Sequence, residues 1–188
     1  MKSYLFVLLS FFMALPQWAN ASYVDLQSGS LMGMVHASYG DSFFDNHHLS
    51  AGMGYVPKLD NHAEMTLFSL RYRYQNPYRF DFNVEGHDFQ FSPVNFGTSL
   101  LYGNHSDLFL ELPDQYPKGY YKPTALRIIF NYQSILHISD KTEVYFDISI
   151  LDVGLITYVR EPEFFMDNYD YLGLEGITNW GFGLRRHF

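Results

Sequence analysis

The stretch LMGMVHASY, from Leu31 to Tyr39, alternates along its length between two kinds of side chain. Counting from Leu31, every second residue is small or apolar, whereas the residues between them include His36 and Ser38. A period of two is that of a β-strand, in which successive side chains point to opposite faces. The stretch therefore predicts a strand with one apolar face and one more polar face.

The same alternation recurs along the rest of the chain. The predicted strands cover residues 28–40, 47–57, 64–75, 78–84, 89–103, 125–137, 142–159 and 173–188. In strand 142–159 the alternation breaks near Leu151 and Asp152, which predicts a β-bulge. Throughout, one face is aromatic or aliphatic, and the other is rich in Gly, Ser, Asn, His, Arg and Asp.

This distribution of polarity separates two kinds of β-protein. A soluble sandwich buries aliphatic faces and exposes the opposite ones to water. An apolar outside around a polar, small-residue inside is what a membrane barrel needs, because only a closed sheet satisfies its backbone within a bilayer. The predicted fold is all-β, a closed antiparallel transmembrane β-barrel of eight strands, in a single domain over residues 22–188.

The composition fits such a barrel and excludes several alternatives. Aromatic residues make up 19% of the chain, with 18 Phe and 16 Tyr, and aromatic girdles at two membrane interfaces would use such a surplus. The net charge of −8 argues against nucleic acid as a partner. The absence of cysteine excludes a disulfide-stapled domain, a thiolate metal site and a cysteine nucleophile.

The first 21 residues are predicted to be a cleaved secretory signal peptide. Lys2 precedes an apolar run that ends at Pro16, and Ala19 to Ala21 form a small-x-small cleavage site. Every later apolar run is broken by polar residues within a few positions, which argues against an inner-membrane helix. The expected location is the cell outer membrane.

The lengths of the connections suggest an orientation. Three short, polar connections are predicted to face the periplasm: Lys58–Ala63, Glu85–Asp88 and Ile138–Lys141. The two longest, Asn104–Thr124 and Glu161–Leu172, then face outward. The first of these contains three prolines and three tyrosines, which fits a folded lid or recognition surface as well as simple packing on the barrel rim.

The last strand carries a family resemblance. Trp180, Phe182, Leu184 and the final Phe188 resemble the terminal strand of bacterial outer-membrane barrels, although Arg186 departs from the apolar face. The resemblance implies recognition of this strand by the barrel-assembly machinery. The other expected partners are outer-membrane lipid and lipopolysaccharide, with no nucleic acid and a monomeric state.

Eight strands enclose an interior just wide enough for side chains, so the sequence predicts a plugged barrel. Its expected lining is mostly charged or hydroxylated: His36, Ser38, His48, Ser50, Arg71, Arg73, Arg79, Asp81, Asp147, Asp152, Glu175 and Arg185. The simplest role for these groups is mutual ion pairing, because an unpaired buried charge costs several kcal/mol.

A catalytic hypothesis stands beside this structural one. The first two predicted strands each place a His and a Ser on the inward face, two residues apart, and an acid could orient the imidazole for acyl transfer. The candidate catalytic residues are His36, Ser38, His48, Ser50, Asp147, Asp152 and Glu175. The spacing resembles that of lipid A 3-O-deacylases, in which the motif lies on a late strand and faces lipid, unlike here.

Three functions therefore remain open from the sequence. The first is a non-enzymatic outer-membrane barrel that is structural or acts through its external loops. The second is a lipid A hydrolase or acyltransferase with a Ser/His/carboxylate site, and the third is a plugged barrel that binds a small ligand. We expect no cofactor and no metal, since the neighbours His47 and His48 point to opposite faces of a strand.

Overall fold

A computed structural model of the 188-residue chain describes residues 21–58, 64–104, 125–167, 169 and 173–188. The predicted signal peptide lies outside these ranges except for Ala21, and so does nearly all of the long connection that follows Asn104. Within the described part, no helix combines the length and the apolar character needed to cross a membrane.

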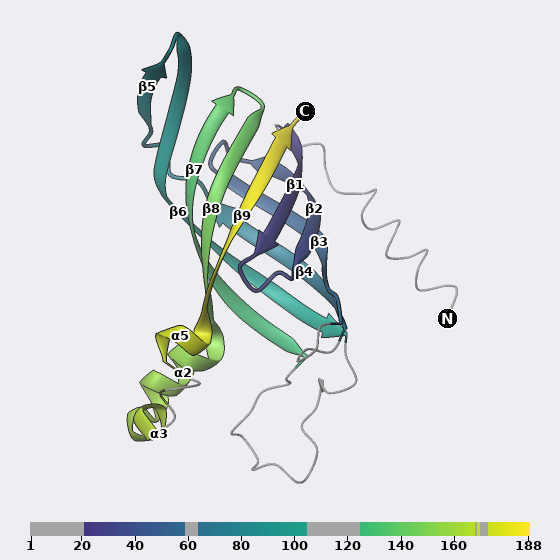
Figure 1. Cartoon of the computed structure of the whole chain (residues 1–188), viewed down its shortest axis with the longest axis vertical. Helices are drawn as coiled ribbons and strands as arrows, with labels where there is room; N and C mark the ends of the chain where they lie inside the picture. The colour runs from purple at the N-terminus through teal and green to yellow at the C-terminus, as the bar shows by residue number, and fades with distance from the viewer. Residues whose placement is uncertain (1–20, 59–63, 105–124, 168, 170–172) are drawn as a thin grey trace, which may run out of the picture.

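Nine strands and three short helices make up the described structure (Figure 1). The strands are β1 Ala21–Gly29, β2 Val35–Phe43, β3 His47–Val56, β4 Met65–Tyr74, β5 Phe80–Val84, β6 His87–Asn104, β7 Leu126–Ser139, β8 Thr142–Leu151 and β9 Thr178–His187. The helices are α2 Asp152–Arg160, α3 Pro162–Asp167 and α5 Leu174–Ile177.

Antiparallel pairing closes eight of these strands into a barrel. β1 pairs with β2 on one side and with β9 on the other, and β4 pairs with β6. The ring β1-β2-β3-β4-β6-β7-β8-β9 therefore has no free edge, which confirms the predicted all-β closed barrel. β5 pairs only with the beginning of β6 and stands outside the ring.

The predicted number of barrel strands is right, but the bounds of one predicted strand and the place of another in the barrel are wrong. The segment 28–40 contains a turn, in which Ser30 and Leu31 have positive φ angles of 56° and 63°, and an unpredicted strand, β1, precedes it. The segment 78–84 forms β5, which is not part of the barrel wall. The alternation of apolar and polar residues continues across this turn by chance. The sequence pattern therefore concealed the end of β1.

The first and last strands of the described structure begin and end at the same end of the barrel, which we call the terminal end. The backbone N–H of Phe188 donates to the carbonyl of Ser22 at 3.0 Å, and that of His187 donates to the carbonyl of Lys141 at 2.8 Å. The short turns at 44–46 and 140–141 and the β5–β6 turn lie at this end, which is the upper end in Figure 1.

The opposite end, which we call the loop end, carries the long connections. Because of the extra strand β1, each following strand up to β4 runs in the direction opposite to the predicted one. β3 therefore ends at Val56 at the loop end, and β4 begins at Met65 at the same end. The connection Lys58–Ala63 therefore joins strands on the same side as the two long ones, and its predicted placement with Glu85–Asp88 and Ile138–Lys141 is wrong.

Helices at the loop end replace two predicted strand segments. The seventh predicted strand, 142–159, ends at Leu151, and α2 begins at Asp152 where we predicted a bulge. The last predicted strand, 173–188, begins with α5, and β9 starts only at Thr178. A β-bulge does occur in β6, where the register with β7 shifts between Ser92 and Asn95.

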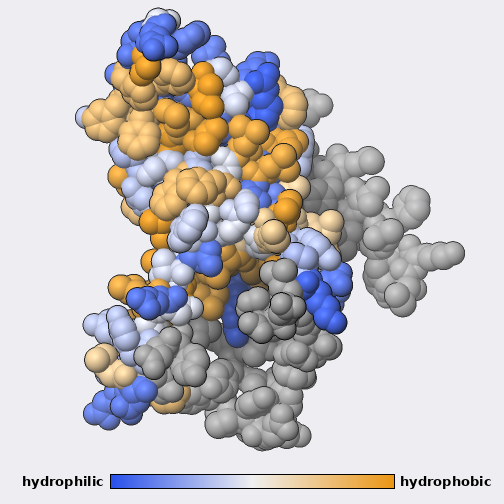
Figure 2. Space-filling model, viewed as in Figure 1, coloured by the Kyte–Doolittle hydropathy of each residue, from blue (hydrophilic) through white to orange (hydrophobic). Residues whose placement is uncertain are grey.

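The outer wall of the barrel is apolar. Large outward-pointing residues of β2, β3, β6 and β9 are more than half exposed: Tyr39, Met53, Phe96, Trp180 and Phe182. In Figure 2 the surface over the strands is predominantly hydrophobic, and hydrophilic residues gather toward the ends. The polarity is thus inverted relative to a soluble protein, as the alternation predicted.

The lumen at the loop end is filled by an apolar cluster. Met32 from the β1–β2 turn packs against Leu67, Leu101 and Ile129, and both Met32 and Ile129 are fully buried. Ser30 anchors this turn, because its hydroxyl donates to the backbone carbonyl of the β8 residue Asp147 at 2.9 Å. Apolar side chains therefore occupy one end of a lumen that is otherwise polar.

Candidate functional site

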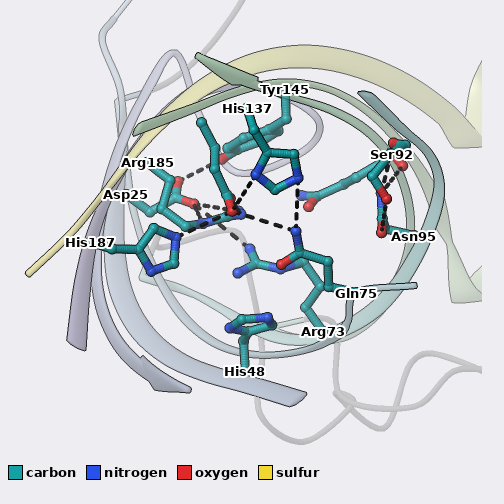
Figure 3. A network of polar contacts seen from close by, with 12 residues as sticks. Asp25, His48, Arg73, Gln75, Ser92, Asn95, His137, Tyr145, Arg185 and His187 are labelled. Carbon is teal, nitrogen blue, oxygen red and sulfur yellow. Dashed lines mark hydrogen bonds and ion pairs between the residues drawn. The ribbon is translucent and has the colours of Figure 1, made fainter. Parts of the chain in front are cut away.

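The buried polar side chains of the lumen form a connected network (Figure 3). Its central group is Arg185 on β9, which is the register partner of Asp25 on β1 and of Glu143 on β8. Its Nε donates to Asp25 Oδ2 at 2.9 Å, and its Nη1 donates to Glu143 Oε2. All three side chains are buried, so one guanidinium bridges two carboxylates where the first and last strands meet.

Two tyrosine rings enclose this guanidinium. The Arg185 Cζ lies 4.8 Å from the ring centroid of Tyr145 and 5.4 Å from that of Tyr23. The Tyr145 hydroxyl also donates to Asp25 Oδ1 at 2.5 Å. Its ring lies against the backbone of Gly183, so a Cβ at this position of β9 would collide with the ring unless the ring moved.

Histidines from two strands surround the second carboxylate. His137 Nδ1 and His187 Nε2 each lie 3.3 Å from Glu143 Oε1. Gln75, which follows β4, has its Nε2 at 3.3 Å from His137 Nε2 and 3.5 Å from Glu143 Oε1. The network therefore links β4, β7, β8 and β9 across the lumen near the terminal end.

Two further arginines enter the lumen from β4. Arg71 Nη2 donates to Gln27 Oε1 at 2.6 Å, and Arg73 Nη1 lies 3.9 Å from Asp25 Oδ2. The guanidinium of Arg73 also lies over the ring of Tyr23, with 5.4 Å between Cζ and the centroid. Further N–H groups of both arginines have no hydrogen-bond partner among the described residues, so the predicted small-ligand alternative stays a prediction.

Asp147 is held by neutral donors. Its oxygens accept hydrogen bonds from Gln133 Nε2 at 2.6 Å, Asn131 Nδ2 at 3.1 Å and the Ser149 hydroxyl at 2.9 Å. It therefore contacts amides and a hydroxyl from β7 and β8, and none of its hydrogen bonds within the described residues is to a histidine.

Buried charges of both signs occur in the described part of the barrel. Three guanidiniums and four carboxylates are less than a tenth exposed: Arg71, Arg73, Arg185, Asp25, Glu143, Asp147 and Asp152. Taking charges out of water costs several kcal/mol each unless partners compensate them. Ion pairs do occur in the lumen as expected: Arg185 pairs with Asp25 and Glu143, and Arg73 lies within ion-pair distance of Asp25.

The predicted serine and histidine residues are inward and buried, but they form other pairs than predicted. His36 Nε2 lies 2.8 Å from Ser69 Oγ, and His48 Nδ1 lies 2.8 Å from Ser42 Oγ. The His36 ring reaches β4 because the intervening position on β3 is Gly52, whose missing side chain leaves room for it. The hydroxyl of Ser38 has no partner in the described structure.

The structure places no carboxylate on either imidazole. His36 Nδ1 and His48 Nε2 have no hydrogen-bond partner in the described part of the chain. Asp152 is buried and accepts a hydrogen bond from the backbone N–H of Ile128 at 3.2 Å, far from a histidine contact. Glu175 lies exposed in α5, so its predicted place in the lumen is wrong.

Two more residues predicted to line the lumen, Arg79 and Asp81, lie outside it. Both are exposed on the β5–β6 hairpin, where Arg79 Nη1 donates to Gln90 Oε1 at 3.1 Å. Sequence reasoning in turn missed Asp25 and Glu143. Glu143 was detectable, because it lies in phase with Asp147 on the same strand, whereas Asp25 belongs to the strand that was not predicted.

The described residues contain no group of three or more His, Asp or Glu side chains arranged to hold a metal ion. The contacts within the lumen instead join many of its donors to protein acceptors. The arrangement shows a filled, cross-linked barrel interior, and the Ser/His pairs in it lack the third member that acyl transfer would need.

Comparisons with known proteins add little to this geometry. No family model matches the sequence, and no curated protein matches it. Among solved structures, the N-terminal β-barrel domain of OprF from Pseudomonas aeruginosa is similar, with 13% identity and a TM-score of 0.47 over 92% of this chain and all of that domain. At this level of similarity, the description of the barrel rests on its own strand pairing.

Proposed function

We propose that this chain is an outer-membrane β-barrel protein that spans the bilayer as a closed, filled barrel and acts through the surfaces at its two ends. The observation that carries the proposal is the inverted polarity. Large apolar side chains such as Phe96 and Trp180 cover the outside, while Arg73, Arg185 and Asp25 are fully buried inside. A lipid environment is the solvent that favours this distribution.

The proposed orientation places the terminal end in the periplasm. The short turns at 44–46 and 140–141 lie there, and short periplasmic turns with longer external connections are typical of such barrels. The loop end, with α2, α3 and α5, then faces outward. This proposal keeps the expected outer-membrane location and supplies the surface through which the protein would act.

The helices at the loop end carry apolar side chains that are exposed in the described structure. Leu155, Ile156 and Val159 are exposed on α2, and Met166 is exposed on α3. Such a cluster beside the mouth of a membrane barrel suits contact with the outer leaflet or with lipopolysaccharide acyl chains. We therefore place the interaction surface here and not in the lumen.

The acyl-transfer alternative has no specific observation in its favour. Both Ser/His pairs lie inside the wall, and neither imidazole contacts a carboxylate in the described structure. A lipid substrate would have to enter a lumen filled by buried side chains. We therefore do not propose an enzyme, and the alternative stays a prediction.

The test is to measure membrane insertion and conductance on the same preparation. Protein purified from outer membranes is reconstituted into planar bilayers after folding has been checked by its heat-modifiable gel mobility. We expect insertion without stable conductance steps, because Tyr23, Tyr145 and the arginines fill the lumen. Stable, ohmic channels in the unmodified protein would contradict the filled barrel, and recovery only in inner-membrane or soluble fractions would contradict the location.

The variant Tyr23→Ala/Tyr145→Ala provides a positive control for the conductance measurement. It removes two fully buried aromatic side chains from the lumen while leaving the outer wall unchanged. We expect this variant to conduct more than the parent protein, which would show that the assay detects an opened barrel of this size.

A further inference from the structure

The β5–β6 hairpin extends beyond the barrel at the terminal end (Figure 1). All five residues of β5, Phe80–Val84, are exposed, and the strand has β6 as its one partner in the described sheet. Its other edge therefore presents unpaired backbone N–H and C=O groups. In the described sheet, β5 is the one strand that has a free edge along its whole length.

The stagger of the barrel explains why this hairpin protrudes. Cross-strand partners followed once around the ring from Phe91 on β6 return to the same strand at Tyr102. A closed barrel of tilted strands requires such an offset. β6 therefore pairs with β4 at one level and reaches much further toward the terminal end, where β5 takes the place of β4.

The hairpin has one aromatic face. Phe80 is the register partner of Phe91, and Phe82 is the partner of Phe89. The rings of Phe82 and Phe89 stack with their centroids 5.7 Å apart, and the ring of Tyr78 lies edge-on to that of Phe80 at 5.0 Å. These rings cover one another only in part, since Phe80, Phe82 and Tyr78 stay between 43% and 62% exposed.

The other face of the hairpin is polar. Asp81 is the register partner of Gln90, and Asn83 is that of Asp88. Asn83 Nδ2 donates to Asp88 Oδ1 at 2.7 Å. The hairpin is thus a two-sided ribbon, and its polar face is suited to water while its aromatic face is not.

The aromatic face continues the outer wall of the barrel. Phe91 is the register partner of Leu136 on β7, and Leu136 is the partner of Val144 on β8. Cross-strand partners point to the same face of a sheet. The rings of the hairpin therefore lie on the side of the sheet that carries the apolar surface around the barrel.

We propose that the aromatic face of the β5–β6 hairpin inserts into the headgroup region of the leaflet at the terminal end and anchors the barrel there. The proposal rests on the membrane placement argued above. Aromatic side chains concentrate at membrane interfaces, where apolar ring and polar surroundings meet. The free edge of β5 sets the depth, because unpaired backbone groups are too costly in the hydrocarbon core but are satisfied by water and headgroups at the interface.

The test uses tryptophan fluorescence in lipid vesicles. The chain has two tryptophans, Trp18 in the predicted signal peptide and Trp180 in the outer wall. In a Trp18→Phe/Trp180→Phe background, Phe82→Trp reports on the aromatic face, and Asn83→Trp reports on the polar face of the same strand. Phe89→Trp, opposite Phe82, is a second reporter if the first variant folds poorly.

We expect Phe82→Trp to emit at shorter wavelength than Asn83→Trp and to lose most of its fluorescence with lipids brominated near the glycerol end of the acyl chain. Equal quenching of the two reporters, or no quenching of Phe82→Trp while Trp180 of the Trp18→Phe variant is quenched, would overturn the anchor and leave the membrane placement intact. A lack of quenching at Trp180 as well would overturn the membrane placement itself.

A second copy of the chain is the competing occupant of the hairpin. Pairing of two copies through their β5 edges would shield residue 82 from lipid. The tryptophan emission of Phe82→Trp would then depend on the protein-to-lipid ratio. Emission from Phe82→Trp that is lipid-quenched and independent of that ratio supports the anchor, whereas unquenched, ratio-dependent emission overturns it.

Discussion

Arg185 and Asp25 form an ion pair across the seam of the barrel, where the last strand meets the first. They are direct register partners although 160 positions separate them in the chain. Both are buried, and Arg185 also binds Glu143 on the next strand. Closure of the barrel therefore coincides with neutralisation of its buried charge, which makes the pair a sensitive point for stability.

We predict that Arg185→Met lowers the free energy of unfolding by about 3–5 kcal/mol, because it leaves Asp25 and Glu143 as buried carboxylates without their main partner. Arg186→Met is the matched control, since the adjacent Arg186 is exposed and hydrogen-bonds only Thr142 in the described structure. Urea unfolding in detergent micelles, followed by Trp180 fluorescence, measures both. Similar losses in the two variants would contradict a structural role for the buried pair.

Gly183 and Tyr145 provide a second test of lumen packing. Gly183→Ala places a methyl group against the Tyr145 ring, and such overpacking costs about 1–3 kcal/mol. In a Tyr145→Ser background the ring is gone, so the same glycine substitution is expected to have little effect. A double-mutant cycle on unfolding free energies measures the coupling, and strictly additive losses would show that the two residues do not interact.

The apolar cluster at the loop end predicts a contrast between two neighbouring isoleucines. Ile129 is fully buried in the cluster, whereas Ile128 points outward and is 43% exposed. Ile129→Ala should cost about 2–5 kcal/mol through lost burial and the cavity left behind. Ile128→Ala should cost clearly less, because its side chain is not packed in the core. Equal losses on chemical unfolding would argue against the cluster.

Much of this fold follows from the period of two in the sequence. The inward positions of His36, Ser50 and Arg71 were predictable because side-chain direction in a strand depends only on local parity. Partner choice is not local. The pair Arg185 and Asp25 depends on register between the two ends of the chain, and alternation alone carries no register.

The sequence predictions that were wrong have a related cause, because they too depend on contacts between distant parts of the chain. Phe80 and Phe82 alternate with polar residues as barrel residues do, so the pattern could not show that β5 lies outside the ring. The turn at Ser30 continued the pattern of its neighbours and hid β1. Ser42 bonds His48 because the two are direct register partners on β2 and β3, and Ser69 bonds His36 because that imidazole reaches across β3 to β4. Neither relationship can be read from spacing in the sequence.

The absence of cysteine allows a direct test of orientation. Glu163 on α3 is exposed at the loop end, and His87 is exposed at the tip of the β5–β6 hairpin. We expect Glu163→Cys to react with a membrane-impermeant maleimide on intact cells. His87→Cys should react only after the outer membrane is permeabilised. The reverse pattern would invert the proposed orientation.

The two buried Ser/His pairs lead to the last prediction. His48 bonds Ser42 and His36 bonds Ser69, but no carboxylate completes either pair in the described structure. An imidazole without an orienting acid is a poor base for a serine nucleophile.

We therefore expect lipid A mass spectra to be the same in cells with and without this protein, and Ser42→Ala and Ser69→Ala to leave them unchanged. Ser38→Ala and Ser50→Ala test the serines favoured by the sequence. The contrary result would be an acyl chain of lipid A that is lost or gained only when the protein is present. If that change disappeared in one serine variant that still shows heat-modifiable mobility, it would establish acyl chemistry and identify the nucleophile.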